Sequence, residues 1–112
     1  YQKVKTIKVG KSPYAIAFDQ EGTKAFVTNQ HENTISVIDT INNKNIKTLA
    51  IGEYPEGINF YSKTKEILIV NWFDSEVVVL NSLNFNIKKR ITVGEGPRGF
   101  GNFIGPNLTK KF

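Results

Sequence analysis

Few side chains in this chain could do chemistry. His31 is the only histidine and cysteine is absent, so these residues alone cannot form a multi-histidine metal site or a zinc–thiolate cluster. No serine has a histidine and an acid at a motif spacing, so a catalytic triad would have to assemble in space. Two acidic pairs lie in expected loops, where we expect them to be solvated: Glu53 with Glu56, and Asp74 with Glu76. We therefore expect no catalytic residue, no metal ligand and no cofactor.

Trp72 and Phe73 are the side chains best suited to binding. They stand together in an expected loop, where the equivalent positions earlier in the chain hold Gln30 and His31. Tryptophan and tyrosine are enriched at binding hot spots. Trp72 is therefore either a contact for a ligand or partner, or a lid that packs over the core of a neighbouring unit.

A repeat of 42 residues positions these side chains. The repeated positions are Gly10, Gly52 and Gly94; Pro13, Pro55 and Pro97; Ile16, Ile58 and Phe100; and Asn29 with Asn71. A self-similar chain is a stack of one small unit. The segment 94–99 also matches the GxGxxG pattern of dinucleotide sites, but the repeat already explains its first glycine and no helical pattern follows.

Each unit is expected to form four short strands. In the first full unit these strands are residues 14–18, 25–28, 34–38 and 45–51. No segment has the 3.6-residue period of an amphipathic helix. Residues 67–70 and 77–80 are apolar without alternation, so their sheet must be covered on both faces. Four-stranded antiparallel sheets stacked around an axis satisfy this requirement, which predicts an all-β fold of the β-propeller type.

The most specific patterns of the repeat are Phe-Val-Thr-Asn at 26–29 and Asn-Thr-Ile-Ser-Val-Ile-Asp-Thr at 33–40, preceded by turns at 10–13 and 19–22. With these motifs the chain resembles the YVTN-type β-propeller repeat over nearly its whole length. The resemblance is strong in residues 5–46 and weaker in 47–88, where Asn81 takes the place of Asp39. It implies a propeller, commonly of seven blades, in a periplasmic, secreted or cell-surface protein. It does not imply a particular catalytic activity.

The repeat length divides the chain into about two and a half blades of a larger ring, which the resemblance implies to be seven-bladed. We expect an outer strand of a preceding blade, two blade repeats, and an inner strand with a C-terminal tail: residues 1–9, 10–51, 52–93 and 94–112. Propellers close with roughly four to eight blades. The expected partners are therefore the remaining blades, in the same chain or in another chain, and the chain is expected to be the C-terminal piece of a longer propeller.

The net charge of +5 has two interpretations. The basic residues gather just before the repeated glycines: Lys3, Lys5, Lys8, Lys44, Lys47, Lys88, Lys89 and Arg90. If this part of the unit is an outer edge strand, lysines there prevent edge-to-edge pairing. That interpretation is favoured over a nucleic-acid patch, and no apolar run approaches the roughly 20 residues that a membrane helix needs.

The resemblance also implies which loops meet. In such propellers, the loop that enters each blade and the loop between its second and third strands meet on one face, which we name the loop face. The candidate binding residues there are Tyr14, His31, Tyr54, Glu56, Trp72, Phe73, Asp74 and Arg98, with Lys11, Ser12 and Glu95 nearby. Binding residues concentrate on loops that a rigid scaffold holds.

The favoured functional prediction is a non-catalytic binding or scaffold propeller that presents the loop face to a protein or another ligand. One alternative is the propeller portion of a periplasmic redox enzyme, similar to quinoprotein amine dehydrogenase heavy subunits or haem d1 domains, with a cofactor supplied mainly by other blades. Another alternative is binding of single-stranded DNA through aromatic residues beside basic ones. Enzymatic activity is thus left open, although the residues favour its absence.

Overall fold

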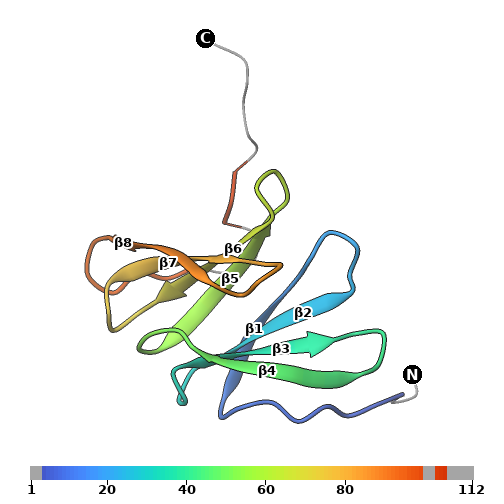
Figure 1. Ribbon diagram of the computed structural model, residues 1–112. Coiled ribbons are helices and arrows are strands. Elements are labelled where there is room, and N and C mark those ends of the chain that lie inside the picture. The colour runs from blue at the N-terminus through green and yellow to red at the C-terminus, as the bar shows by residue number, and fades with distance from the viewer. Residues whose placement is uncertain (1–3, 100–102, 106–112) are drawn as a thin grey trace.

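Two four-stranded antiparallel sheets make up the computed structural model, which describes residues 4–99 and 103–105 (Figure 1). Their strands, in sheet order, are β1 (Pro13–Phe18), β2 (Lys24–Asn29), β3 (Thr34–Asp39) and β4 (Lys44–Ala50), then β5 (Pro55–Tyr61), β6 (Glu66–Asn71), β7 (Glu76–Asn81) and β8 (Ile87–Thr92). The described ranges contain no helix, and hence none long and apolar enough to cross a membrane. The predicted all-β class is confirmed.

The main core lies between the two sheets, where β5 packs against β1 and β2. Its largest members are apolar side chains from both sheets: Phe26, Ile35, Val37, Ile58, Ile67, Ile69, Val78 and Leu80. Complete burial of one such side chain contributes about 1.5–3 kcal/mol. The two sheets therefore stack face to face, as the unbroken apolar runs of β6 and β7 predicted.

The outer strands carry the basic residues. All six residues of β8 are exposed, and β4 is exposed at every position except Leu49. Lys88 and Arg90 of β8 form ion pairs with Glu66 and Glu76, both at 2.5 Å. The prediction that lysines mark an outer edge strand is confirmed for β4 and β8.

The sequence predicted two four-stranded units with one further strand at each end, ten strands in all. The described residues form eight, because the two end segments are not strands. Residues 4–12 and 93–99 carry no strand assignment. A strand needs a hydrogen-bonded neighbour, and their expected neighbours belong to other blades. Ile7 and Val9 nevertheless pack against Ala25, Val27 and Ile38, on the face of the first sheet opposite the main core. Residues 1–3, 100–102 and 106–112 lie outside the described residues, and the four predicted blade boundaries stay predictions.

The repeated glycines and asparagines contact each other. The backbone N–H of Gly10 donates to Asn29 Oδ1 at 3.2 Å, and a Cβ at Gly10 would lie 2.7 Å from Asn29 Cγ. A Cβ at Gly52, where φ is +134°, would lie 2.3 Å from Asn71 Nδ2, which donates to Ile51 O at 3.1 Å. Each asparagine thus ties the end of a second strand to the loop that enters its blade. A Cβ at these glycines would collide with the asparagine and also with acidic side chains: Glu32 at Gly10, and Asp74 and Glu76 at Gly52.

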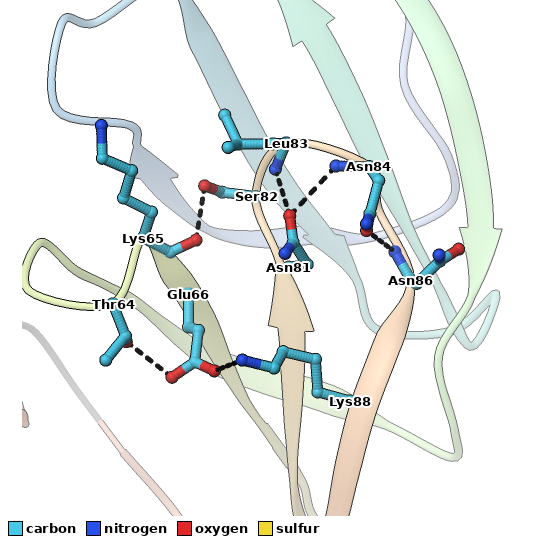
Figure 2. A network of polar contacts seen from close by, with 9 residues as sticks. All are labelled: Thr64, Lys65, Glu66, Asn81, Ser82, Leu83, Asn84, Asn86 and Lys88. Carbon is cyan, nitrogen blue, oxygen red and sulfur yellow. Dashed lines mark hydrogen bonds and ion pairs between the residues drawn. The ribbon is translucent and has the colours of Figure 1, made fainter.

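Asn81 organises the turn after β7. Its Oδ1 accepts hydrogen bonds from the backbone N–H groups of Leu83 and Asn84, at 2.8 and 3.1 Å (Figure 2). Asp39 stabilises the equivalent turn after β3 in the same way. Its Oδ1 accepts hydrogen bonds from Ile41 N at 2.9 Å and Asn42 N at 3.1 Å. Asparagine and aspartate both stabilise such turns with a side-chain oxygen. The replacement that weakens the YVTN-type pattern therefore preserves its physical role.

We expect Asn81→Ala to destabilise the fold by about 1 kcal/mol, because two backbone donors lose their acceptor at an exposed turn. Asn81→Asp keeps the accepting oxygen and is expected to remain within about 0.5 kcal/mol of the parent protein. Urea denaturation of the three proteins measures both values. Equal losses from the two substitutions would contradict the role of the side-chain oxygen.

Glu66 forms a second polar cluster near this turn. Lys88 Nζ and Thr64 Oγ1 donate to its carboxylate, at 2.5 and 2.6 Å (Figure 2). The Lys88 hydrogen bond, followed by that of Thr64, lowers the pKa of Glu66 below its ordinary value of 4.5. A carboxyl group whose pKa is lower in the folded than in the unfolded state stabilises the fold at pH values above its unfolded-state pKa. This contribution is lost as the pH falls through its folded-state pKa.

Stability is therefore expected to fall as the pH drops below about 4.5. Glu66→Gln removes the titrating group, so this variant should show a smaller loss of melting temperature over the same pH range. Thermal unfolding from about pH 6 to about pH 3 tests the difference. Parallel pH profiles for the two proteins would contradict a contribution from Glu66.

Candidate functional site

The loop face has a repeated left-handed backbone position just before each repeated proline. The φ angles of Ser12, Tyr54 and Gly96 are 53°, 62° and 62°. The carbonyl oxygens of Ser12 and Tyr54 accept hydrogen bonds from Gln30 N at 3.0 Å and Trp72 N at 3.1 Å. These bonds join the loop entering each blade to the loop between its second and third strands. The two kinds of loop therefore meet, as the resemblance implied.

Tyr54 occupies a position that glycine would fill with less strain. A left-handed conformation costs a bulky L-residue about 1–2 kcal/mol, and Gly96 takes it in the next unit. The backbone N–H of Tyr54 donates to Asn33 Oδ1 at 3.0 Å, which holds the strained turn in place. Such strain often accompanies functional positions, so it directs attention to the tyrosine side chain.

Four rings form what we name the aromatic cluster: His31, Tyr54, Trp72 and Phe73. The centroid of Tyr54 lies 5.4 Å from His31, 5.4 Å from Trp72 and 4.8 Å from Phe73. Trp72 and Phe73 are 4.6 Å apart. Each such pair contributes about 0.5–1.5 kcal/mol beyond burial. Phe73 is still 59% exposed and Trp72 is only half-buried, so the cluster offers an open aromatic surface.

His31 also contacts Ser12, with 2.5 Å between Nδ1 and the hydroxyl oxygen. Its second nitrogen faces the hydroxyl of Tyr54 at 3.4 Å. A catalytic serine–histidine pair needs an acid to orient the histidine, and this position is taken by a phenol. Sequence spacing did not reveal the contact between Ser12 and His31, because these residues are 19 positions apart in two different loops.

Glu56 differs most from its prediction as a solvated loop residue, because it is only 1% exposed. It belongs to β5, where Thr28 Oγ1 donates to its backbone carbonyl at 2.9 Å. Gln30 Nε2 donates to its Oε2 at 2.6 Å, and Arg98 Nε lies 3.7 Å from Oε1. The guanidinium carbon of Arg98 lies 5.2 Å from the centroid of the Trp72 ring. A buried carboxylate, an arginine and an aromatic ring thus form one group.

The other three acidic residues that were predicted to be solvated differ: two are exposed and one is paired within a strand. Glu53 and Asp74 are exposed, as predicted, and Asp74 Oδ2 accepts a hydrogen bond from Glu53 N at 2.7 Å. Glu76 is not a solvated loop residue, because it belongs to β7 and pairs with Arg90. Its Oε2 also accepts a hydrogen bond from Asn71 Nδ2 at 3.0 Å.

Tyr14 stands on an inner strand rather than in the loops that hold the aromatic cluster. It belongs to β1, is 40% exposed, and lines a groove of about 600 Å³ between the two inner strands. The groove is bounded by Tyr14, Ala15, Ile16, Ala17 and Phe18 on one side, and by Gly57, Ile58, Asn59, Phe60 and Gly99 on the other. The contacts therefore join His31, Tyr54, Trp72 and Phe73 with Arg98 and Glu56. Asp74 is adjacent in sequence, and Tyr14 faces the groove.

Solved structures provide the comparison with known proteins, because no protein-family model and no curated protein matches the sequence. The chain is similar to Kuenenia stuttgartiensis hydrazine synthase, with a TM-score of 0.71 and 24% identity over 77% of this chain and 25% of that one. It is also similar to apo AztD from Citrobacter koseri, with a TM-score of 0.70 and 16% identity over 81% and 26% of the two chains. A third match is dihydro-heme d1 dehydrogenase NirN in complex with DHE, with a TM-score of 0.66 and 12% identity over 78% and 20% of the two chains.

These matches are β-propeller proteins, and the chain spans about a quarter or less of each. Identities below 25% establish a shared fold and carry no activity across. Two blades are too few to close a ring, so the remaining blades lie elsewhere. The two sheets of this chain are neighbouring blades of a β-propeller.

Proposed function

We propose that this chain is part of a non-catalytic binding or scaffold propeller whose loop face holds a partner protein. The observation that carries the proposal is the open aromatic cluster, in which a strained Tyr54 lies against Trp72 and a Phe73 that is 59% exposed. Exposed aromatic side chains on rigidly held loops are typical of binding hot spots. The same loops lack the acid–histidine arrangement that catalysis by Ser12 would need.

Replacement of Phe73 by alanine tests the proposal, because Phe73 is exposed and its loss should leave the core intact. Leu83→Ala is a matched control, since Leu83 is 66% exposed in the turn after β7, at the other end of that strand. We expect proteins captured from source-cell extracts by the parent protein to be retained by the Leu83 variant and lost with the Phe73 variant. The capture of the same proteins by all three, with unchanged melting temperatures, would refute a role for the loop face.

Binding of single-stranded DNA is less compatible with the charges in these loops. Glu53, Asp74 and Glu95 are exposed around the aromatic residues. Five of the basic residues lie instead on the outer strands: Lys44, Lys47, Lys88, Lys89 and Arg90. Affinity for nucleic acid depends on cations that neutralise phosphates beside the stacking rings. No retention of the protein on single-stranded DNA at low salt is therefore the expected result.

The second candidate is the propeller portion of a redox enzyme, which the names of two matched structures suggest for those proteins. Such a role would depend mainly on a cofactor held by blades outside this chain. A visible absorbance band in the protein isolated from its source would support this candidate. A periplasmic or cell-surface location is likewise proposed from the resemblance, and fractionation of source cells tests it.

A further inference from the structure

The group formed by Trp72, Glu56 and Arg98 has the composition of a binding slot for an organic cation. The Trp72 ring forms one wall, and aromatic faces attract cations through their quadrupole. The Glu56 carboxylate forms the floor and is fixed by the 2.6 Å hydrogen bond from Gln30. The guanidinium of Arg98, 5.2 Å from the ring centroid, already shows that such a group fits.

Arg98 fills this slot incompletely. Its Nε lies 3.7 Å from Glu56 Oε1, beyond hydrogen-bond distance. Among the described residues Oε1 has no hydrogen-bond partner, although Glu56 is 1% exposed. A buried carboxylate without its hydrogen bonds is costly. The Arg98 side chain remains 49% exposed, so a solvent-borne group can compete with it for the carboxylate. A cation that approached Oε1 more closely would satisfy the carboxylate better than Arg98 does.

The loops around this site carry a net negative charge, whereas the chain as a whole is positively charged. Five acidic residues and two basic residues belong to the loop face and its rim: Glu32, Glu53, Glu56, Asp74 and Glu95, with Lys11 and Arg98. Their net charge is −3, with His31 neutral, whereas the whole chain carries +5. Complementary charge steers partners and selects among them. The loop face is thus suited to a basic partner.

We propose that the slot between Trp72 and Glu56 recognises a guanidinium or ammonium group on a basic peptide segment of a partner protein, and that Arg98 occupies the slot until this segment displaces it. The inference rests on the proposed binding role of the loop face. A peptide fits better than a small free cation because the Trp72 ring lies 4.6 Å from the exposed ring of Phe73 and 5.4 Å from the half-buried ring of Tyr54, which provide contact for neighbouring residues.

Displacement explains why Arg98 would weaken binding in the parent protein. A tethered side chain competes at an effective concentration that a short connection raises to about the millimolar range. Removal of Arg98 should therefore increase the affinity for a basic peptide. A purely structural tie between the blades predicts no such increase, so the direction of the change distinguishes the two roles.

Trp72 provides the readout, because it is the only tryptophan in the chain and a cation over its ring changes its fluorescence. The probes are a short peptide with a central arginine and the same peptide with neutral citrulline. We expect the arginine peptide to bind the Arg98→Ala protein about tenfold more tightly than the parent protein, and the citrulline peptide to bind neither. Arg98→Gln serves as a second variant if the alanine variant is unstable, and Trp72→Phe subtracts fluorescence from tryptophans outside this chain.

Equal affinities of the parent and Arg98 variants, or equal affinities for the two peptides, would overturn the proposal. Glu56→Gln in the Arg98→Ala background is expected to abolish the preference for arginine, and its persistence would also count against the slot. Ethylguanidinium binding as tightly as the arginine peptide would overturn the assignment to a peptide. If these tests fail while Phe73→Ala still abolishes partner capture, the loop face remains a binding surface and only the cation slot is refuted.

Discussion

Gly57→Ala is expected to destabilise the protein by about 3 kcal/mol, because the added methyl group meets backbone rather than a movable side chain. A Cβ at Gly57 would lie 2.3 Å from the carbonyl oxygen of Gly99 and 3.0 Å from its Cα. The equivalent positions of the three units hold Ala15, Gly57 and Gly99, all small. At Gly57 a small residue is needed because the backbone of the next unit approaches β5 closely.

The matched control for this substitution is Gly94→Ala. Gly94 has no atom within 4 Å of a Cβ and no positive φ, so alanine should change the free energy of unfolding by less than about 0.5 kcal/mol. Chemical denaturation of the protein that contains this chain measures both variants. Equal stability of the two variants would show that the segment around Gly99 does not rest against β5.

Asn29→Ala is expected to cost about 2–3 kcal/mol, because one fully buried side chain serves three partners. Its Oδ1 accepts from Gly10 N at 3.2 Å, and its Nδ2 donates to Thr34 Oγ1 at 3.1 Å and Ser36 Oγ at 2.9 Å. Alanine would leave the Gly10 donor without its acceptor and open a cavity beside it. The loop that enters the first blade would lose the hydrogen bond between Gly10 and the end of β2.

Asn45→Ala provides the comparison for this second substitution. Asn45 is an exposed residue of β4 with one long hydrogen bond, 3.3 Å from its Nδ2 to Lys8 O, so its loss should cost less than about 0.5 kcal/mol. Thermal unfolding of both variants tests the difference. Comparable losses would contradict the role assigned to the buried asparagine.

The repeat was sufficient to predict the two sheets because its signals are local. Turn residues and apolar runs specify short strands, and a constant interval implies identical units. The segments 4–12 and 93–99 were less predictable, because a strand at the border of a unit depends on hydrogen bonds from another unit. The sequence alone also did not reveal why glycine recurs at Gly10 and Gly52, since the crowding comes from asparagine and acidic side chains about 20 residues away.

The aromatic part of the site was predictable from residue type and loop position, and the buried acid was not. Glu56 directly follows a repeated proline, and nothing local distinguishes it from the solvated Glu53. Its burial arises from partners in other units, Gln30 on one side and Arg98 on the other. The first five residues of β5 are all buried, so the one available signal was membership of a covered inner strand rather than residue type.

The left-handed position before each repeated proline bears on how a propeller of this kind acquires new binding partners. Serine, tyrosine and glycine all occupy it here, at Ser12, Tyr54 and Gly96, with φ between 53° and 62°. The scaffold thus tolerates exchange at one site per blade without a change of backbone. Variation confined to these sites would alter recognition step by step while the architecture stays constant, which makes them natural starting points for randomised libraries.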